Sequence, residues 1–109
     1  MAFDDALAKR VRALVNDAKG VVEKKMFGGI AFLVRGNMSV GVHRTELIVR
    51  VDPEETDAAL REPGVRIFDI TGRPMKGWLL VASSAVSDKK ALAKWVRRGV
   101  AYATSLPAK

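Results

Sequence analysis

The residues best placed to do chemistry are four basic side chains near the C-terminus. Lys90, Lys94, Arg97 and Arg98 are spaced by four, three and one residues, so a helix would place them on one side. Such a stripe can follow a nucleic-acid backbone, because each phosphate that it neutralises releases counterions. The solvated outer face of a surface helix has the same pattern, and we favour this plainer interpretation of the four residues.

Most of the net positive charge of the chain lies in the C-terminal segment that contains these four residues. The chain has 109 residues and a formal net charge of +7, yet residues 89–109 hold six of the 19 basic residues and none of the 12 acidic ones. Arg73 and Lys76, in and beside a predicted turn, could extend the basic surface. The segment 52–62 supplies a rival explanation, because its acids could pair with the basic helix within one molecule or across a dimer. These acids are Asp52, Glu54, Glu55, Asp57 and Glu62.

A pair of adjacent glycines, Gly28 and Gly29, is the second candidate site. Successive backbone amides can form an anion-binding nest, but a phosphate-binding loop normally leads into a helix. Here the glycines lead into the apolar run Ile30–Val34, which predicts a strand. We therefore predict a bulge or sharp bend between two strands, with Phe27 and Phe32 in the core. A small-ligand or enzymatic site beside the glycines is the remaining alternative.

The other titratable residues do not form a recognisable catalytic set. His43 is the single histidine, and without cysteine it cannot build a transition-metal site alone. Glu54, Glu55 and Asp57 fall in the first turn of a predicted helix, where acids are expected for capping and dipole reasons. We predict no catalytic residue, no metal and no cofactor, and we expect the protein not to be an enzyme.

The elements that must position these residues follow from the period of the apolar side chains. Leu7, Val11 and Leu14 lie at helical spacing, whereas Leu47, Val49 and Val51 alternate as in a strand. We predict helices at residues 4–18, at 53–62 after the cap Asp52, and at 88–105 after the cap Ser87. We predict strands at 21–27, 30–34, 38–42, 46–51, 66–70 and 77–82, with some of these runs continuous. The fold class is α+β: an antiparallel sheet of about five strands flanked by N-terminal and C-terminal helices, with a short middle helix, in one domain spanning 1–109.

Composition limits the cellular setting. The absence of cysteine agrees with a reducing compartment, and no apolar run approaches the roughly 20 residues of a membrane-spanning helix. The N-terminal residues lack the apolar core of a signal peptide. We expect a cytoplasmic protein with no membrane association.

One stretch of the sequence resembles a known family. The run 25–38, Lys-Met-Phe-Gly-Gly-Ile-Ala-Phe-Leu-Val-Arg-Gly-Asn-Met, is similar to the signature of the TfoX (Sxy) N-terminal domain family. The strand at 46–52 and the helix at 92–102 look like later elements of the same domain, so the resemblance covers essentially the whole chain. It implies an antiparallel sheet flanked by helices, similar to the folds of secretion chaperones.

The resemblance also implies a function. Full-length members of this family regulate natural competence and carry a second, helical C-terminal domain, so we expect this chain to be a stand-alone N-terminal domain. The family supplies no catalytic residues, and its signature positions transfer to this chain as structural ones: Met26, Phe27, Gly28, Gly29 and Gly36.

The function we predict first is a non-enzymatic regulatory or adaptor domain that acts through contact with a protein, for example in transcription regulation. The alternative is direct nucleic-acid binding by the basic C-terminal helix. The sequence does not name the protein partner, and it leaves open a homodimer formed through a sheet edge or a helix face.

Overall fold

The structure, a computed structural model, describes residues 4–16, 20–26, 29–69 and 72–107. Two short 3-10 turns, η1 (Pro53–Glu55) and η2 (Ser83–Val86), precede the second and the third α-helix of the chain. None of the described helices is long and apolar enough to cross a membrane. In chain order the helices and strands are α1 (Asp5–Val15), β1 (Val21–Met26), β2 (Gly29–Val34), β3 (Asn37–His43), β4 (Glu46–Arg50), α2 (Thr56–Leu60), β5 (Val65–Phe68), β6 (Met75–Val81) and α3 (Lys89–Ser105).

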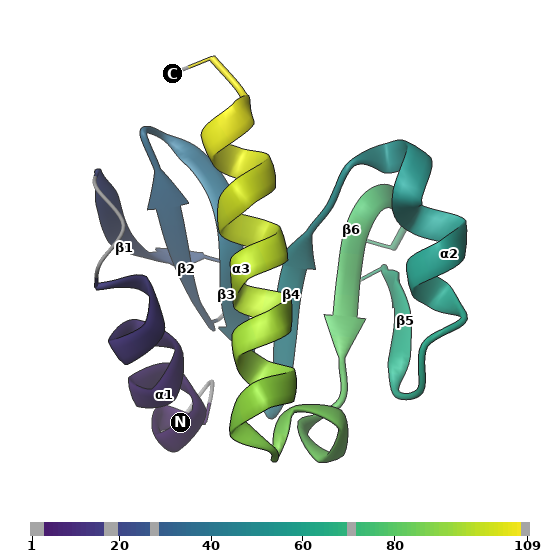
Figure 1. Cartoon of the computed structure of the whole chain (residues 1–109), viewed down its shortest axis with the longest axis horizontal. Coiled ribbons are helices and arrows are strands. Elements are labelled where there is room, and N and C mark those ends of the chain that lie inside the picture. The colour runs from purple at the N-terminus through teal and green to yellow at the C-terminus, as the bar shows by residue number, and fades with distance from the viewer. Residues whose placement is uncertain (1–3, 17–19, 27–28, 70–71, 108–109) are drawn as a thin grey trace.

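The described strands form a single antiparallel sheet in the order β1-β2-β3-β4-β6-β5. The α+β class predicted from the sequence is therefore confirmed. Six described strands are present where about five were expected, because each apolar run of the meander forms a strand of its own. Helices α1 and α3 lie across the same face of the sheet, and α2 lies at the side of β6 and β5 (Figure 1).

The helix ends follow from local capping. Asp4 accepts hydrogen bonds from the amides of Ala6 (2.9 Å) and Leu7 (3.2 Å), so α1 begins at Asp5, one residue later than predicted. The carboxylate of Asp52 accepts from the amide of Glu54, as predicted, but the turn that it caps is the 3-10 turn η1. These caps satisfy backbone amides that have no partner inside the helix.

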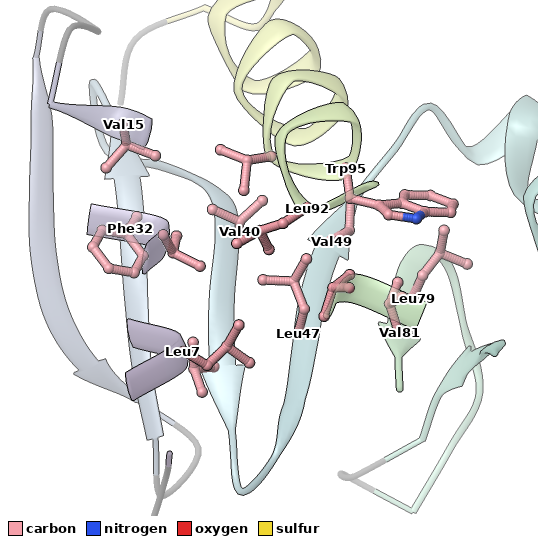
Figure 2. Close-up of a cluster of buried hydrophobic side chains, with 14 of the residues drawn as sticks. Leu7, Val15, Phe32, Val40, Leu47, Val49, Leu79, Val81, Leu92 and Trp95 are labelled. Atoms are coloured by element: carbon pink, nitrogen blue, oxygen red, sulfur yellow. The ribbon is translucent and has the colours of Figure 1, made fainter. Parts of the chain in front are cut away.

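The main hydrophobic core fills the space between the sheet and the two helices on its face. Alternate strand residues point into it, since successive side chains on a strand project to opposite faces. Figure 2 shows the side chains converging from α1, four strands and α3. The residues labelled there are Leu7, Val15, Phe32, Val40, Leu47, Val49, Leu79, Val81, Leu92 and Trp95, all of them buried.

Residues of the opposite sheet face form a second, smaller cluster of buried side chains. Ile48 and Leu80 are neighbours across β4 and β6, and both are buried although they point away from the main core. The remaining buried members of this cluster are Ala31, Met38 and Phe68. Strand β4 is thus buried on both faces, with Leu47 and Val49 in the main core and Ile48 in the second cluster.

The β2–β3 hairpin holds the C-terminal end of α3. Arg35 and Gly36 have φ angles of 49° and 86°, as a two-residue type I′ turn requires. The guanidinium of Arg35 donates to the carbonyl of Thr104 (2.6 Å). The side-chain amide of Asn37 donates to the carbonyl of Pro107 (2.8 Å). The turn therefore supplies donors to backbone carbonyls at and just beyond the end of α3.

Helix α3 approaches strand β3 closely at Gly99. A Cβ atom at this position would lie 2.5 Å from the carbonyl oxygen of Ser39 and 2.6 Å from Cγ1 of Val40. Only glycine fits between the helix axis and the strand at this distance. This contact fixes the height of α3 above the sheet, and with it the positions of all the basic residues on the helix.

Candidate functional site

Helix α3 begins one residue later than the sequence predicted. The predicted cap, Ser87, has helical backbone angles and its hydroxyl donates to the carbonyl of Ser84, so it belongs to the preceding turn. Asp88 is extended, and its carboxylate accepts from the amide of Ala91 (3.2 Å). Asp88 is therefore the N-cap, because an extended residue at this position can turn its side chain toward the third amide of the helix.

The basic stripe on α3 is divided into two pairs, and one pair is neutralised within the molecule. Lys94 and Arg98 both donate to the carboxylate of Glu62, which follows α2, and the Arg98 bond measures 2.9 Å. Arg98 also lies 3.7 Å from a carboxylate oxygen of Glu55. The acidic segment 52–62 therefore pairs with the basic helix within one molecule, which was one of the two pairings that the sequence left open.

The indole of Trp95 completes this arrangement. The ammonium of Lys94 lies 5.0 Å from the centre of the ring, and the guanidinium carbon of Arg98 lies 4.6 Å from it. A cation over an aromatic face is attracted by the ring quadrupole, so the ring helps to orient both side chains toward Glu62. We call Glu62, Lys94, Trp95 and Arg98 the α2–α3 clasp.

The clasp shifts the titration of Glu62. The hydrogen bond from Lys94 is the largest cause and holds the pKa of Glu62 below its ordinary range, with Arg98 acting in the same direction. Partial burial of the carboxylate opposes this shift but does not cancel it. The ionised form of Glu62 is therefore the one that the fold stabilises.

We expect Glu62→Gln to lower the free energy of unfolding by about 1 kcal/mol at pH 7, because two partly exposed ion pairs are lost. A carboxylate whose folded pKa is depressed stabilises the fold above its unfolded pKa of about 4.3, and this contribution is lost as the pH falls through the lower folded pKa. The difference between wild type and variant should therefore shrink below about pH 4.3. Urea unfolding followed at several pH values from 7 down to 3 measures it.

Glu54→Gln is the matched control, because it removes the same charge from the same acidic segment. Glu54 is exposed and forms no ion pair with any residue that the structure describes. Its stability difference from wild type should stay below that of Glu62→Gln at pH 7 and depend less on pH. Equal pH dependence of the two variants would show that the clasp does not contribute.

The second pair of the stripe is exposed. Lys90 and Arg97 have no carboxylate partner within the described ranges, and the Nε of Arg97 donates only to the carbonyl of Ala93 one turn earlier. Arg73 and Lys76 are likewise exposed and unpaired in the described part of the chain, before and within the start of β6. The structure thus separates the six predicted contact residues into two held by acids and four that point to solvent.

The glycine pair lies at the connection between β1 and β2. Met26 pairs with Gly29, and the two residues between them, Phe27 and Gly28, lie outside the described residues. A Cβ atom at Gly29 would lie 2.0 Å from the carbonyl oxygen of Val42, so close packing against β3 requires glycine there. Strands β1 and β2 are antiparallel neighbours, and the bend predicted between them lies outside the described residues. Packing accounts for Gly29 without a ligand.

The remaining titratable candidates are dispersed. His43 is half-buried at the end of β3 and pairs in the sheet with Glu46. No group of three or more His, Cys, Asp or Glu side chains that could hold a metal ion is found among the described residues. Of the acids in the first turns of the middle helix, Glu55 contacts Arg98, as described above.

Two hollows were not predicted from the sequence. One, of about 320 Å³, lies between α3 and the connection after β4. Its lining combines both signs of charge: Val51, Asp52, Glu55, Arg98, Ala101 and Tyr102. The other, of about 240 Å³, lies between α1 and α3 and is lined by Arg10, Ala13, Leu14, Lys89 and Leu92. We call the second hollow the α1–α3 groove. No local sequence pattern indicates it, because the lining residues of its two walls are about 80 residues apart in the chain.

Comparison with known proteins decides the family. The profile of the TfoX N-terminal domain matches residues 13–103, which include every described strand and most of α3. The chain belongs to the TfoX N-terminal domain family. The resemblance seen in the sequence is thereby confirmed. No curated protein and no solved structure matches the chain.

The signature run of the family, residues 25–38, can be located in the structure. In this TfoX N-terminal domain the described part of the run 25–38 comprises the last two residues of β1, strand β2, the β2–β3 turn and the first two residues of β3. Gly29 is required by contact with β3, and Gly36 by its positive φ. Both glycines therefore have structural roles in this chain.

Proposed function

We propose that this TfoX N-terminal domain is a non-enzymatic regulatory or adaptor domain that acts by contact with a protein partner. The α2–α3 clasp carries the proposal. Two of the four basic side chains on α3 are already neutralised by Glu62 and Glu55, so a phosphate backbone would have to compete with these carboxylates for them. Family membership supports the proposal, since full-length relatives are regulators of competence.

A second candidate function is direct nucleic-acid binding by the exposed cations. Lys90 and Arg97 are seven residues apart on α3, which places them about 10.5 Å apart along one helix face. Each phosphate that a cation neutralises contributes about 0.9 to the slope of log affinity against log salt. Two free cations therefore predict a slope of about 2, and engagement of all four stripe residues predicts about 4.

Photo-crosslinking in the cells that carry the gene tests both functions. A photoreactive amino acid is placed in turn at exposed positions on α1, β1 and α3: Ala13, Val22, Arg97 and Ala101. We expect protease-sensitive adducts with the same protein from neighbouring positions and no nuclease-sensitive adduct. Nuclease-sensitive adducts from Arg97, together with a salt slope of about 2 to 4 for duplex DNA, would favour the second function. Absence of any protein adduct at all four positions would overturn the proposal.

A further inference from the structure

The α1–α3 groove has a more apolar lining than the hollow beside Asp52 and Glu55. Helices α1 and α3 lie side by side, with the N-terminal half of α3 against α1 (Figure 1). Leu92 is buried at the base of the groove, Leu14 is half-buried, and the methyl group of Ala13 is exposed at its side. These side chains leave a hollow between two parallel ridges of helix surface. A third helix can pack into such a hollow, as helices do in bundles.

Two cations flank this apolar floor. Arg10 belongs to α1 and Lys89 is the first residue of α3, so one charge lies on each wall. Neither side chain has a carboxylate partner within residues 4–16, 20–26, 29–69 and 72–107. By contrast, the nearby Arg12 and the clasp residues Lys94 and Arg98 are all paired with glutamates. The groove is therefore a place where positive charge is left without an internal counterpart.

Arg10 is already oriented for an external partner. Its Nη2 atom donates to the carbonyl of Ser87 (3.1 Å), which ties the guanidinium across the gap between the helices. A guanidinium has five N–H donors, so most of them remain for a carboxylate. The carboxylate of Asp88 already caps the positive end of the α3 dipole, so the attraction for an external carboxylate comes from the side chains of Arg10 and Lys89.

The size of the groove selects among ligands. Its volume of about 240 Å³ lies below the range of about 300–1,000 Å³ typical of small-molecule sites. A hollow of this size, open along two helices, suits one or two apolar side chains projecting from a helix. The flanking cations require carboxylates on either side of those side chains.

We propose that the α1–α3 groove binds an acidic amphipathic helix of a partner protein, whose apolar side chains enter between Leu14 and Leu92 while its carboxylates meet Arg10 and Lys89. This is recognition of a helix in a groove, in which apolar residues at helical spacing anchor the ligand and charges set its orientation. The inference rests on the proposed adaptor function and names the surface that carries it out.

A designed peptide tests this inference. The probe is a fluorescently labelled helix of about 15 residues, long enough for measurable helicity, with leucines on one face, Glu and Asp beside them, and Ala and Gln elsewhere. Its control is the same peptide with every acid replaced by Lys. Binding to the full chain is measured by fluorescence anisotropy. We expect the acidic peptide to bind and the lysine peptide to bind at least about tenfold more weakly.

Variants of the chain locate the binding surface. Ala13→Glu and Lys89→Glu each place a negative charge in the groove, and each should weaken binding of the acidic peptide about tenfold. Lys9→Glu is the matched control, because Lys9 is exposed on α1 but does not line the groove. It should change the affinity less than about threefold, as expected of a charge outside the contact. Circular dichroism confirms that each variant keeps its helices.

Three outcomes would overturn the inference. Equal binding of the lysine peptide would remove charge complementarity, and equal binding by Ala13→Glu and Lys89→Glu would place the contact elsewhere. Sedimentation could instead show a wild-type dimer that Ala13→Glu dissociates, in which case a second copy occupies the groove. Failure here is distinguishable from failure of the adaptor function: protein adducts from Val22 or Ala101 without any from Ala13 keep the adaptor function and exclude the groove.

Discussion

Replacing Gly99 by valine is expected to lower the free energy of unfolding by about 3 kcal/mol. The first added carbon would lie 2.5 Å from the Ser39 carbonyl oxygen, well inside van der Waals contact, and the branched methyl groups need still more space. Neither partner can yield cheaply. Ser39 belongs to the central strand β3, and its hydroxyl is bonded to the carbonyl of Phe32. The helix must therefore lift away from the sheet, which opens the core around Leu92 and Trp95.

Ala101→Val on the same helix separates this steric effect from helix propensity. Ala101 is exposed, so the substitution there should cost no more than about 0.7 kcal/mol. Gly99→Ala is a further check: it gains about 1 kcal/mol of helix propensity over glycine and should still be destabilising, because its Cβ meets the same oxygen. Urea unfolding of the variants measures the differences. If Gly99→Val and Ala101→Val are equally stable, α3 does not depend on the contact with β3.

Trp95→Ala is expected to cost about 3–5 kcal/mol, the range for truncating a large aromatic side chain in a core. The indole is 3% exposed and points toward the β6 side of the core, where Leu79 lies (Figure 2). Its removal leaves a cavity and also withdraws the ring that orients Lys94 and Arg98. Since a domain of this size has a total stability of about 5–15 kcal/mol, the effect is measurable by the urea midpoint.

Trp95→Phe keeps an aromatic ring and should be destabilised less than Trp95→Ala, which provides a folded comparison if the alanine variant is largely unfolded. The double variant Trp95→Phe, Glu62→Gln should be more stable than the sum of the two single effects predicts, because residues that share one cluster are coupled. Strict additivity would mean that the ring does not support the ion pairs. A loss below about 1 kcal/mol for Trp95→Ala would contradict its place in the core.

Much of the fold was predictable because the strands and helices follow from the local spacing of apolar residues. The alternation of Leu47, Val49 and Val51 located β4, and the apolar run Ile30–Val34 located β2. The predicted ends of helices were less accurate where a side chain has two possible hydrogen-bond partners nearby in the chain. Ser87 was expected to cap α3, but its hydroxyl closes the preceding turn and Asp88 takes its place.

The candidate site was only partly predictable, because it depends on contacts between distant segments. In the sequence, the acids and the bases lie in two separate segments, and their pairing was left open. The packing of α2 against α3 brings Glu62 into ion pairs with both Lys94 and Arg98. The α1–α3 groove was missed altogether. Arg10 and Lys89 have no common sequence signal, and only the packing of both helices on one sheet face brings them to the same groove.

The hydrogen bonds between the β2–β3 turn and the end of α3 have a consequence for how the molecule opens locally. The last turn of a helix ordinarily frays, since its final carbonyls lack partners. Here Arg35, despite its unfavourable positive φ, donates to Thr104, and Asn37 donates to Pro107. Unwinding that end of the helix thus requires breaking bonds to the hairpin as well. The hairpin and the helix end consequently form one cooperative unit, and the terminal turn of α3 opens together with the turn that holds it.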